Sequence, residues 1–336
     1  MNPILPRLMA LVTLLSPAAA VLAQTGKAPF TVDDLVRLKR VSDLPSSPDG
    51  RYVAFVLRET DMEANKGRTD IWLLDLNGNT PLLRQLTTDP ANDSSPRWAP
   101  DSRTIYFLST RAESSQVWRL SVDGGEQQQV TRYPLGVDSL KVSPTGRHLA
   151  LTMEVIPDCA ELQCTKDRLD ADEKSKATGQ IYDRVFVRHW DTWKNGTRSH
   201  LFTVPLAQSG TAGKPVNVSG KLDADVPSKP FGDDEDYDFS PDGTRIVFSA
   251  RAVGRSEPWS TNFDLYEAPV DGSTEPKNLT STNPAWDAQP TFLKNGDLAY
   301  LAMQRPGFEA DRFHLVIRNG RTGTTRHVTQ GWDRSI

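Results

Sequence analysis

Four similar stretches of sequence decide the fold of this chain. Residues 46–55 read SSPDGRYVAF, residues 99–108 read APDSRTIYFL, residues 142–151 read VSPTGRHLAL and residues 239–248 read FSPDGTRIVF. The complete form starts with a tight turn, because Pro presets its own φ, Asp caps the turn through its side chain, and Gly accepts a positive φ. The alternating apolar residues that follow have the period of a β-strand.

Each copy continues with the same further parts. A second strand carries Asp, an aliphatic residue and an aromatic one, as in DIWLLDLNG at 70–78 and DLYEAPVDG at 264–272. A turn and a short strand follow, and the short strand ends in Leu-Thr or Val-Thr, at Thr131, Thr280 and Thr329. The repeated unit is therefore a set of consecutive short strands joined by turns.

The spacing of the turns identifies the architecture. Pro48, Pro100, Pro144 and Pro241 are separated by 52, 44 and 97 residues, and the equivalent Lys294 follows after another 53. Four short strands in a period of this length are typical of a β-propeller blade. The sequence predicts an all-β propeller of four-stranded antiparallel blades, with about five complete blades and a sixth barely begun at the end.

The third spacing is about twice the period, which indicates an insertion at about 154–199. The insertion holds a charged stretch and then VFVRHWDTW, in which apolar and aromatic residues return densely. Insertions of this size often shape the binding face of a propeller; the alternative is a solvated excursion without function. Cys159 and Cys164 lie in it, and in an oxidising compartment they favour a local disulfide. Two free thiols, or a metal site with further ligands, are the alternatives.

The beginning of the chain has the pattern of a secretory leader at 1–23. Arg7 precedes an apolar run, and small residues stand at Val21 and Ala23 before the expected cut. A membrane anchor is the alternative, but Pro17 interrupts a run that would need about 20 apolar residues. We expect cleavage near Gln24 and a periplasmic or secreted protein.

A helical lead-in at 24–40 is predicted before the first blade. The string TVDDLVRLKRV indicates a short helix at about 32–38, because Thr31 can cap it and its charges suit the helix ends. Acidic residues come first and basic residues last, at Asp33, Asp34, Arg37 and Lys39.

The charge composition of the chain limits the classes of partner that we expect. Charged residues make up 24% of the chain, and its formal net charge is -4. This balance gives no reason to expect nucleic acid or an anionic membrane surface as a partner.

No catalytic signature is present in the sequence. It has no Gly-x-Ser-x-Gly nucleophile elbow, no His-Glu-x-x-His, no phosphate-binding glycine loop and no calcium loop. Most of its five histidines lie in segments with the sequence pattern of ordinary strands or loops, where a structural role is expected. We therefore expect no catalytic residue, no metal and no cofactor in this chain.

The motifs resemble the N-terminal part of secreted serine peptidases of the prolyl oligopeptidase family, near the dipeptidyl-peptidase 5 and acylaminoacyl-peptidase branch. The resemblance rests on the repeated Ser-Pro-Asp-Gly turns, on the segment at 30–55, and on DRVFVRHWDTW and SEPWSTNFDLY at 183–193 and 256–266.

This resemblance implies a seven-bladed propeller that caps a C-terminal α/β-hydrolase domain. The family's Ser-Asp-His triad lies in that domain, and the propeller restricts entry to short or unfolded peptides. The implied partners are a short peptide and the hydrolase domain of the same full-length protein. A homodimer of the full-length protein is an additional expectation. We expect the sequence to be truncated before the hydrolase domain and to be inactive alone.

Candidate substrate residues follow from the need of an exopeptidase to hold a terminal ammonium. A carboxylate beside aromatic walls suits this task, and Glu257 with Trp259 is one such pairing. Asp191 with Trp190 and Trp193 is another, and Arg188 could meet a substrate carbonyl or carboxylate. The alternative for each is blade packing or a surface ion pair, and the acidic run GDDEDYDFS at 232–240 is expected to be a solvated loop.

A second interpretation of the sequence is a propeller without enzymatic activity. A non-enzymatic periplasmic propeller, similar to that of the Tol system, shares the turns and the leader and binds protein partners. The long insertion and the EPWSTNFDLY string stand against it.

Overall fold

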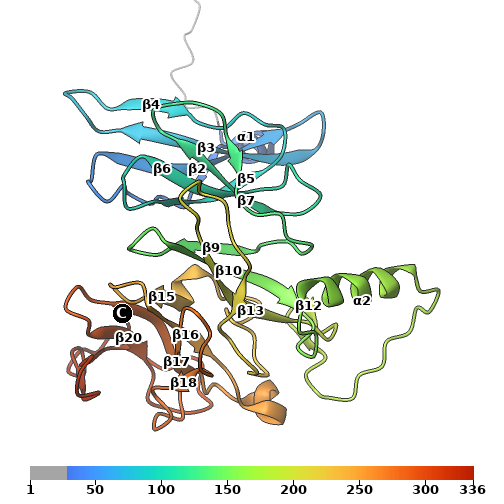
Figure 1. Cartoon of the computed structure of the whole chain (residues 1–336), viewed down its shortest axis with the longest axis vertical. Helices are drawn as coiled ribbons and strands as arrows, with labels where there is room; N and C mark the ends of the chain where they lie inside the picture. The colour runs from blue at the N-terminus through green and yellow to red at the C-terminus, as the bar shows by residue number, and fades with distance from the viewer. Residues whose placement is uncertain (1–28) are drawn as a thin grey trace, which may run out of the picture. The chain divides into compact units, whose positions relative to one another are not determined.

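The computed structural model describes residues 29–336, and within them five antiparallel four-stranded sheets follow one another along the chain (Figure 1). The strands of each sheet are hydrogen-bonded in chain order. In each sheet the repeated turn lies between the first and the second strand. The predicted all-β fold of four-stranded blades is confirmed, and the sheets are called blades one to five below.

The blades have the following strands. Blade one consists of β1 (Arg40–Ser42), β2 (Tyr52–Asp61), β3 (Lys66–Asp75) and β4 (Leu82–Gln85). Blade two consists of β5 (Asp93–Trp98), β6 (Thr104–Ser109), β7 (Gln116–Ser121) and β8 (Gln128–Gln129). Blade three consists of β9 (Ser139–Val142), β10 (His148–Val155), β13 (Arg198–Pro205) and β14 (Val216–Asn217).

Blade four consists of β15 (Tyr237–Phe239), β16 (Arg245–Ala250), β17 (Asp264–Pro269) and β18 (Lys277–Asn278). Blade five consists of β19 (Asp287–Phe292), β20 (Leu298–Ala302), β21 (His314–Arg318) and β22 (Thr325–His327). The insertion between β10 and β13 contains α2 (Leu162–Lys174), β11 (Arg188–His189) and β12 (Thr192–Trp193). Two 3-10 helices belong to blade four: η1 (Asp234–Asp236) before β15 and η2 (Gly254–Trp259) before β17.

The Ser-Pro-Asp-Gly strings form closed turns through side-chain hydrogen bonds. Ser47 Oγ donates to Asp49 Oδ1 at 2.6 Å and accepts from the backbone N–H of Tyr52 at 3.0 Å. Gly50 takes a φ of 71°, which a side chain at that position would oppose. The serine, the aspartate and the glycine thus each contribute to the turn that precedes the second strand. The same two bonds recur in blade four at Ser240, Asp242 and Arg245.

A second hydrogen bond recurs in all five described blades. In blade four the hydroxyl of Thr280 accepts from the backbone N–H of Leu265 at 2.9 Å. Leu265 lies on the third strand, just beyond the residues that pair with the short fourth strand. Its buried N–H would otherwise lack an acceptor. The bond explains why the short strands end in Leu-Thr or Val-Thr. The equivalent pairs are Ile71 with Thr87, Val117 with Thr131, Leu201 with Ser219 and Leu315 with Thr329.

Apolar clusters lie between successive blades. Between blades three and four, Leu201 packs in one cluster with Tyr237, Phe239, Ile246 and Phe248. Similar clusters join blades one and two, two and three, and four and five. Burying one such large apolar side chain contributes about 1.5–3 kcal/mol relative to leaving it exposed. The core of the blades is therefore a series of interfaces between neighbours.

The lead-in helix α1 (Val32–Arg37) belongs to a separate compact unit that ends at Leu38. Thr31 Oγ1 accepts from the backbone N–H of Asp34, whose carboxylate accepts from the N–H of Thr31 in return. The predicted helix is confirmed, and it stops one residue early because Leu38 adopts a ψ of 124°. The leader at 1–23 lies outside the described residues. Among the helices that are described, none has the length and apolar character to cross a bilayer.

Candidate functional site

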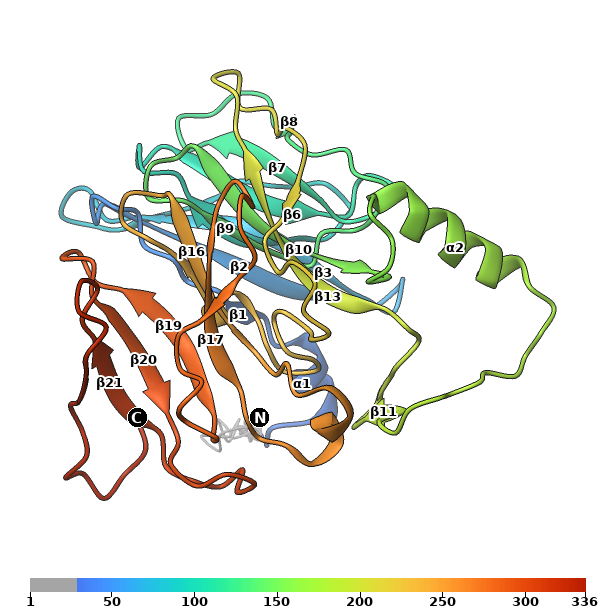
Figure 2. The same cartoon turned by 60° about the horizontal axis from the view of Figure 1, so that its bottom comes forward.

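The insertion is fixed to blade three near its start. A disulfide joins Cys159 to Cys164 just before and within the first turn of α2. Thr165, the buried residue of α2, accepts a hydrogen bond from the backbone N–H of Ile156 at 3.1 Å. Figure 2 shows α2 and the segment that follows it on the outside of the sheets, before the chain returns at β11. The disulfide and this bond together hold the first part of the insertion.

The helix α2 was not predicted from the sequence, although the charged stretch 165–180 contains most of it. The helix lacks a broad apolar face, which is the pattern that normally reveals one. Pairs of side chains four residues apart stabilise it instead. Gln163 donates to Asp167 at 2.8 Å, and Lys166 forms an ion pair with Asp170.

A cavity of about 880 Å³ opens between the insertion and the loops of blades three and four. Side chains from the insertion line one side of it, among them Arg184, Phe186 and Lys194. Asp223 and Glu257 line it from the loops of the blades. The cavity therefore brings together segments that are far apart in the sequence.

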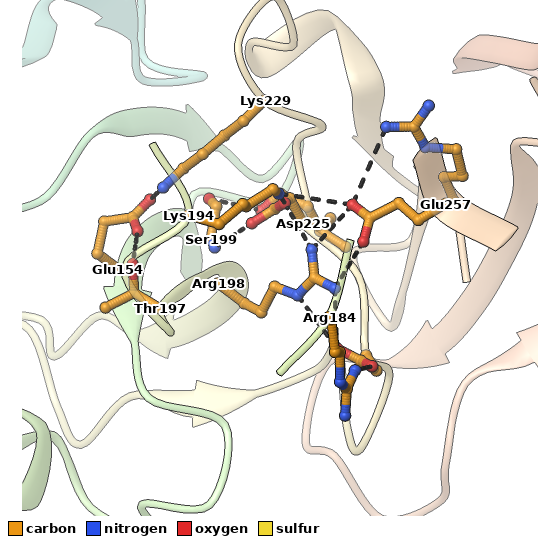
Figure 3. A network of polar contacts seen from close by, with 12 residues as sticks. Glu154, Arg184, Lys194, Thr197, Arg198, Ser199, Asp225, Lys229 and Glu257 are labelled. Carbon is orange, nitrogen blue, oxygen red and sulfur yellow. Dashed lines mark hydrogen bonds and ion pairs between the residues drawn. The ribbon is translucent and has the colours of Figure 1, made fainter. Parts of the chain in front are cut away.

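Arg198, the first residue of β13, is the centre of an ion-pair cluster beside this cavity (Figure 3). Its guanidinium donates to both carboxylate oxygens of Glu257, each at 2.9 Å. It also donates to Asp225 at 3.0 Å and to Asp223 at 2.9 Å. Burial alone would lower the pKa of Arg198, but the hydrogen bonds and charges of these carboxylates raise it above its usual value. Arg198 therefore stays charged and binds three carboxylates.

Asp225 is the most buried member of the cluster, with a side chain that is 4% exposed. Its carboxylate accepts from Lys194 Nζ at 2.7 Å and from the backbone N–H of Ser199 at 3.0 Å. Burial acts to raise the pKa of Asp225, but the positive charges of Lys194 and Arg198 outweigh it, so the pKa is lowered. Asp225 is thus an anion held in place by two cations.

Glu257 connects the cluster to blade four. It lies in η2, and its side chain is 12% exposed. Lys194 Nζ is 3.5 Å from it, and a guanidinium nitrogen of Arg251 is 3.9 Å away. Arg251 also lies against two rings, with its guanidinium carbon 5.7 Å from the centroid of Phe186 and 5.0 Å from that of Phe263. Glu257 therefore sits on the blade-four side of a mixed cluster of charges and aromatic rings.

The candidate residues of the VFVRHWDTW string lie on a hairpin made by β11 and β12. Arg188 pairs with Trp193 across the hairpin, and its guanidinium lies 5.3 Å from the indole ring. Trp190 and Asp191 form the turn between the two strands. Trp190 has a φ of 48°, is 74% exposed, and meets the edge of Phe231 at 5.7 Å between centroids.

Five of the six candidates lie outside the ion-pair cluster, and none of the five lines the cavity; Glu257 is the exception. Asp191 is exposed and takes part in no ion pair of the described structure; its carboxylate accepts a hydrogen bond from Thr192 Oγ1 at 3.5 Å. Trp259, at the end of η2, is 69% exposed. The structure therefore puts the carboxylate of Glu257 inside the cluster and the indole of Trp259 on the surface.

Six residues of the cluster were not predicted from the sequence: Arg184, Lys194, Arg198, Asp223, Asp225 and Arg251. Asp223 and Asp225 follow the last strand of blade three in the string KLDADVPS, and no known motif marks them. Lys194 and Arg198 come just after the hairpin. A signal was available in the density of charges that flank this hairpin, but nothing in the sequence pairs them with the two aspartates.

The acidic run 232–240 is not the solvated loop that we expected. Asp234 of η1 forms a two-pronged ion pair with Arg97 of β5, at 2.7 and 3.1 Å, and Arg97 also binds Asp43 at 2.8 Å. Burial, together with the charge of Asp233, raises the pKa of Asp236 to about 7. The run folds back because Arg97 offers it a partly buried positive partner. In the described residues no group of acidic, histidine or cysteine side chains has the geometry of a metal site.

Comparison with known proteins supports the resemblance drawn from the sequence. The TolB beta propeller domain family matches residues 36–178. Dipeptidyl-peptidase 5 of Porphyromonas endodontalis is 30% identical over 292 residues, which cover 86% of this chain and 40% of that protein. Dipeptidyl-peptidase 5 of Porphyromonas gingivalis is 29% identical over 311 residues, with 91% and 44% covered.

The fold has a match among solved structures. Uncomplexed acylaminoacyl peptidase from Pyrococcus horikoshii superposes with a TM-score of 0.60 at 14% identity, over 89% of this chain and 41% of that one. The chain thus spans less than half the length of the relatives that it matches.

Proposed function

Because this chain is a β-propeller related to dipeptidyl-peptidase 5, we propose that it forms the substrate-gating part of a secreted serine exopeptidase. The enzyme would release dipeptides or acylated residues from the N-termini of peptides. The observation that carries the proposal is the cavity of about 880 Å³ beside Glu257, in a chain similar to peptidases over most of its length. Cavities of this size hold small ligands, and a dipeptide falls within that range.

The chemistry of the cavity wall suits the end of a peptide. Glu257 offers a carboxylate for a terminal ammonium, and its burial makes a charged hydrogen bond there stronger than one on the surface. Arg184 lines the same cavity and is exposed, so that it can meet a carbonyl or carboxylate group of the substrate. These groups together would select a chain end over a chain interior.

The hairpin supplies a second set of substrate contacts. Trp190 and Trp193 are exposed, and Arg188 lies over the ring of Trp193. Exposed aromatic side chains on a propeller insertion are suited to apolar parts of a peptide. We assign Arg188, Trp190, Asp191, Trp193 and Trp259 to the walls of the entry path. Glu257 is assigned to its end.

We assign catalysis to a hydrolase domain of the same protein, which would be the main partner of the propeller. In the described residues no side-chain hydrogen bond joins a serine hydroxyl to a histidine ring, the pairing that activates the nucleophile in a serine peptidase. The relatives are more than twice as long as the part they share with this chain. The triad belongs, in this proposal, to that additional length.

Location outside the cytoplasm is part of the proposal. The leader pattern in the sequence supports it, and so does the disulfide between Cys159 and Cys164, which requires an oxidising compartment to persist. The proposed partners are short peptides, and neither nucleic acid nor membrane lipid is proposed as a partner. The full-length protein is proposed to form a homodimer.

The test uses the enzyme expressed from its complete reading frame. Hydrolysis of a dipeptidyl substrate and of its N-acetylated form is compared for Glu257→Gln and Asp191→Asn, with Asp172→Asn as a control that lines the same cavity. The variant that removes the ammonium anchor should lose roughly 2–4 kcal/mol of transition-state binding for the free substrate only. Wild-type efficiency of both variants on both substrates would refute these anchors. Absence of any serine-inhibitor-sensitive hydrolysis would refute the enzyme itself.

The second candidate is a propeller that binds protein partners without catalysis. The match of residues 36–178 to the TolB beta propeller domain favours it. The complete reading frame decides between the two, because a nucleophile elbow followed by Asp and His after the propeller belongs to the peptidase, whereas a stop codon there belongs to the scaffold.

A further inference from the structure

The ammonium of Lys194 occupies a place suited to a substrate ammonium. Lys194 Nζ lies 2.7 Å from Asp225 and 3.5 Å from Glu257 (Figure 3). It also lies 5.5 Å from the ring centroid of Phe186. Two carboxylates and the face of an aromatic ring are the surroundings that bind a primary ammonium. The pocket formed by Asp225, Glu257 and Phe186 is called the ammonium pocket below, and it is filled by the protein's own side chain.

The charges around this pocket do not allow a second ammonium beside Lys194. The cluster already has more cations than carboxylates, and the side chain of Lys194 is only 18% exposed. Another positive charge added in such poorly solvated surroundings would lack a partner. A substrate ammonium that replaces that of Lys194 leaves the total charge as it was. The carboxylates are Asp223, Asp225 and Glu257, and the cations are Arg184, Arg198, Arg251 and Lys194.

Lys194 also ties the insertion to the two blades. It follows β12 directly, and its backbone N–H donates to Val187 O at 3.0 Å, so it stands at the base of the hairpin. Its side chain reaches Asp225 in the loop after blade three and Glu257 in blade four. Loss of these two contacts would free the base of the hairpin on the side of the cavity.

We propose that Lys194 is a built-in competitor for the terminal ammonium of the substrate. In the free protein its ammonium fills the ammonium pocket; a peptide with a free N-terminus displaces it and thereby releases the base of the hairpin. This inference rests on the proposed function, which supplies a substrate with a free amine. It adds Lys194 as a residue that sets the affinity for such a substrate. It also adds the ion pairs of Lys194 as contacts that break when the substrate binds.

The first test measures binding to this chain by calorimetry. The probes are alanyl-phenylalaninamide and its N-acetyl derivative. Lys194→Met should bind the free amide at least about tenfold more tightly than the wild type, because a competing ion pair is gone, and should bind the acetylated probe equally. Lys221→Met is the matched control, since Lys221 lines the same cavity but forms no ion pair in the described structure, and it should behave like the wild type. Equal or weaker binding of the amide by Lys194→Met overturns the proposal.

The variant should fold, because Asp225 keeps its bonds from Arg198 and from the N–H of Ser199. A thermal melt checks this, and Lys194→Gln is the second variant if Met disturbs the packing on Phe186. A wild type that binds no amide is also informative. Binding by Lys194→Met alone then supports the competitor, and binding by neither protein overturns it.

A second readout follows the base of the hairpin. Hydrogen–deuterium exchange of the segment 186–196, which includes the backbone N–H of Lys194, is measured by mass spectrometry. It should become severalfold faster when the amide saturates the protein and should not change with the acetylated probe. Unchanged exchange at saturation overturns the proposal.

The variant Glu257→Gln separates this inference from the proposed function. If it still binds the amide like the wild type, the ammonium anchor itself has failed. If it loses the amide while Lys194→Met gains nothing, only the competitor role has failed.

Discussion

Arg97 in blade two and Asp234 in blade four, 137 residues apart, share two hydrogen bonds at 2.7 and 3.1 Å. The same guanidinium donates to Asp43, which directly follows strand β1 of blade one, at 2.8 Å. Its side chain is 17% exposed, and the carboxylates raise the pKa of Arg97 beyond its ordinary value against the opposing effect of burial. One side chain therefore links the first, second and fourth blades.

Replacement of Arg97 by Met should destabilise the fold. Removal of one partner of a buried ion pair costs about 3–5 kcal/mol, and the partial exposure of this cluster lowers our expectation to about 2–4 kcal/mol. Urea unfolding followed by circular dichroism measures the change. Arg103→Met is the control, because Arg103 and Asp123 form an exposed pair whose loss should cost less than about 1 kcal/mol. Equal effects of the two substitutions would contradict the structural role of Arg97.

The recurring threonine bond predicts the cost of a single hydroxyl. Thr280→Val keeps the shape of the side chain but leaves the buried N–H of Leu265 without its acceptor. The free energy of unfolding should fall by about 1–3 kcal/mol, the cost of an unsatisfied buried donor. Thr274→Val, in the exposed loop before β18, should change it by less than about 0.5 kcal/mol. A Thr280 variant as stable as the wild type would show that the bond contributes nothing net.

The raised pKa of Asp236 predicts a pH dependence of stability. The carboxyl titrates near 3.8 in the unfolded chain and at about 7 in the fold, so between these values the folded protein holds a proton that the unfolded one has lost. Stability then falls as pH rises through this window, by up to about 1.4 kcal/mol per pH unit from this group. Asp236→Asn removes the titration. The stability of this variant relative to the wild type should increase from pH 4 to pH 8, and a constant difference would rule out the assigned shift.

The backbone of Trp190 predicts a conflict between stability and binding. A φ of 48° is unfavourable for Trp and tolerated by Asn. Trp190→Asn should leave the melting temperature of the chain unchanged or higher. If Trp190 forms a wall of the entry path, the same variant should raise KM for apolar dipeptidyl substrates severalfold in the complete enzyme. A variant that melts lower and keeps its KM would place Trp190 among the residues that hold the hairpin together.

The features that the sequence revealed are those that depend on neighbours along the chain. The turns at Ser47 and Ser240 close within six residues, and the strands after them alternate with a period of two, so both could be read from short strings. α1 was visible for the same reason, since Thr31 and Asp34 cap each other. α2 was missed because its ion pairs and its single buried threonine leave no apolar stripe.

The site depended on distant contacts and was only partly visible. The Glu-Pro-Trp string pointed to Glu257, but its partner Arg198 stands 59 residues away and gave no signal of its own. The run that contains Asp234 looked solvated because the cation that neutralises it lies in another blade. Pairing of charges across blades is set by the packing of the blades, which the order of residues alone does not express.

The composition of the ion-pair cluster makes the cavity a sensor of blade packing. Arg198 comes from blade three, Glu257 from blade four, and Lys194 from the insertion. If blade four opens by local unfolding, Glu257 leaves with it, and Arg198 loses two of its hydrogen bonds at once. A chain with one detached blade would thus lose the proposed binding site in a single step before its remaining strands melt, and binding of the amide probe would be a stricter measure of correct assembly than secondary structure.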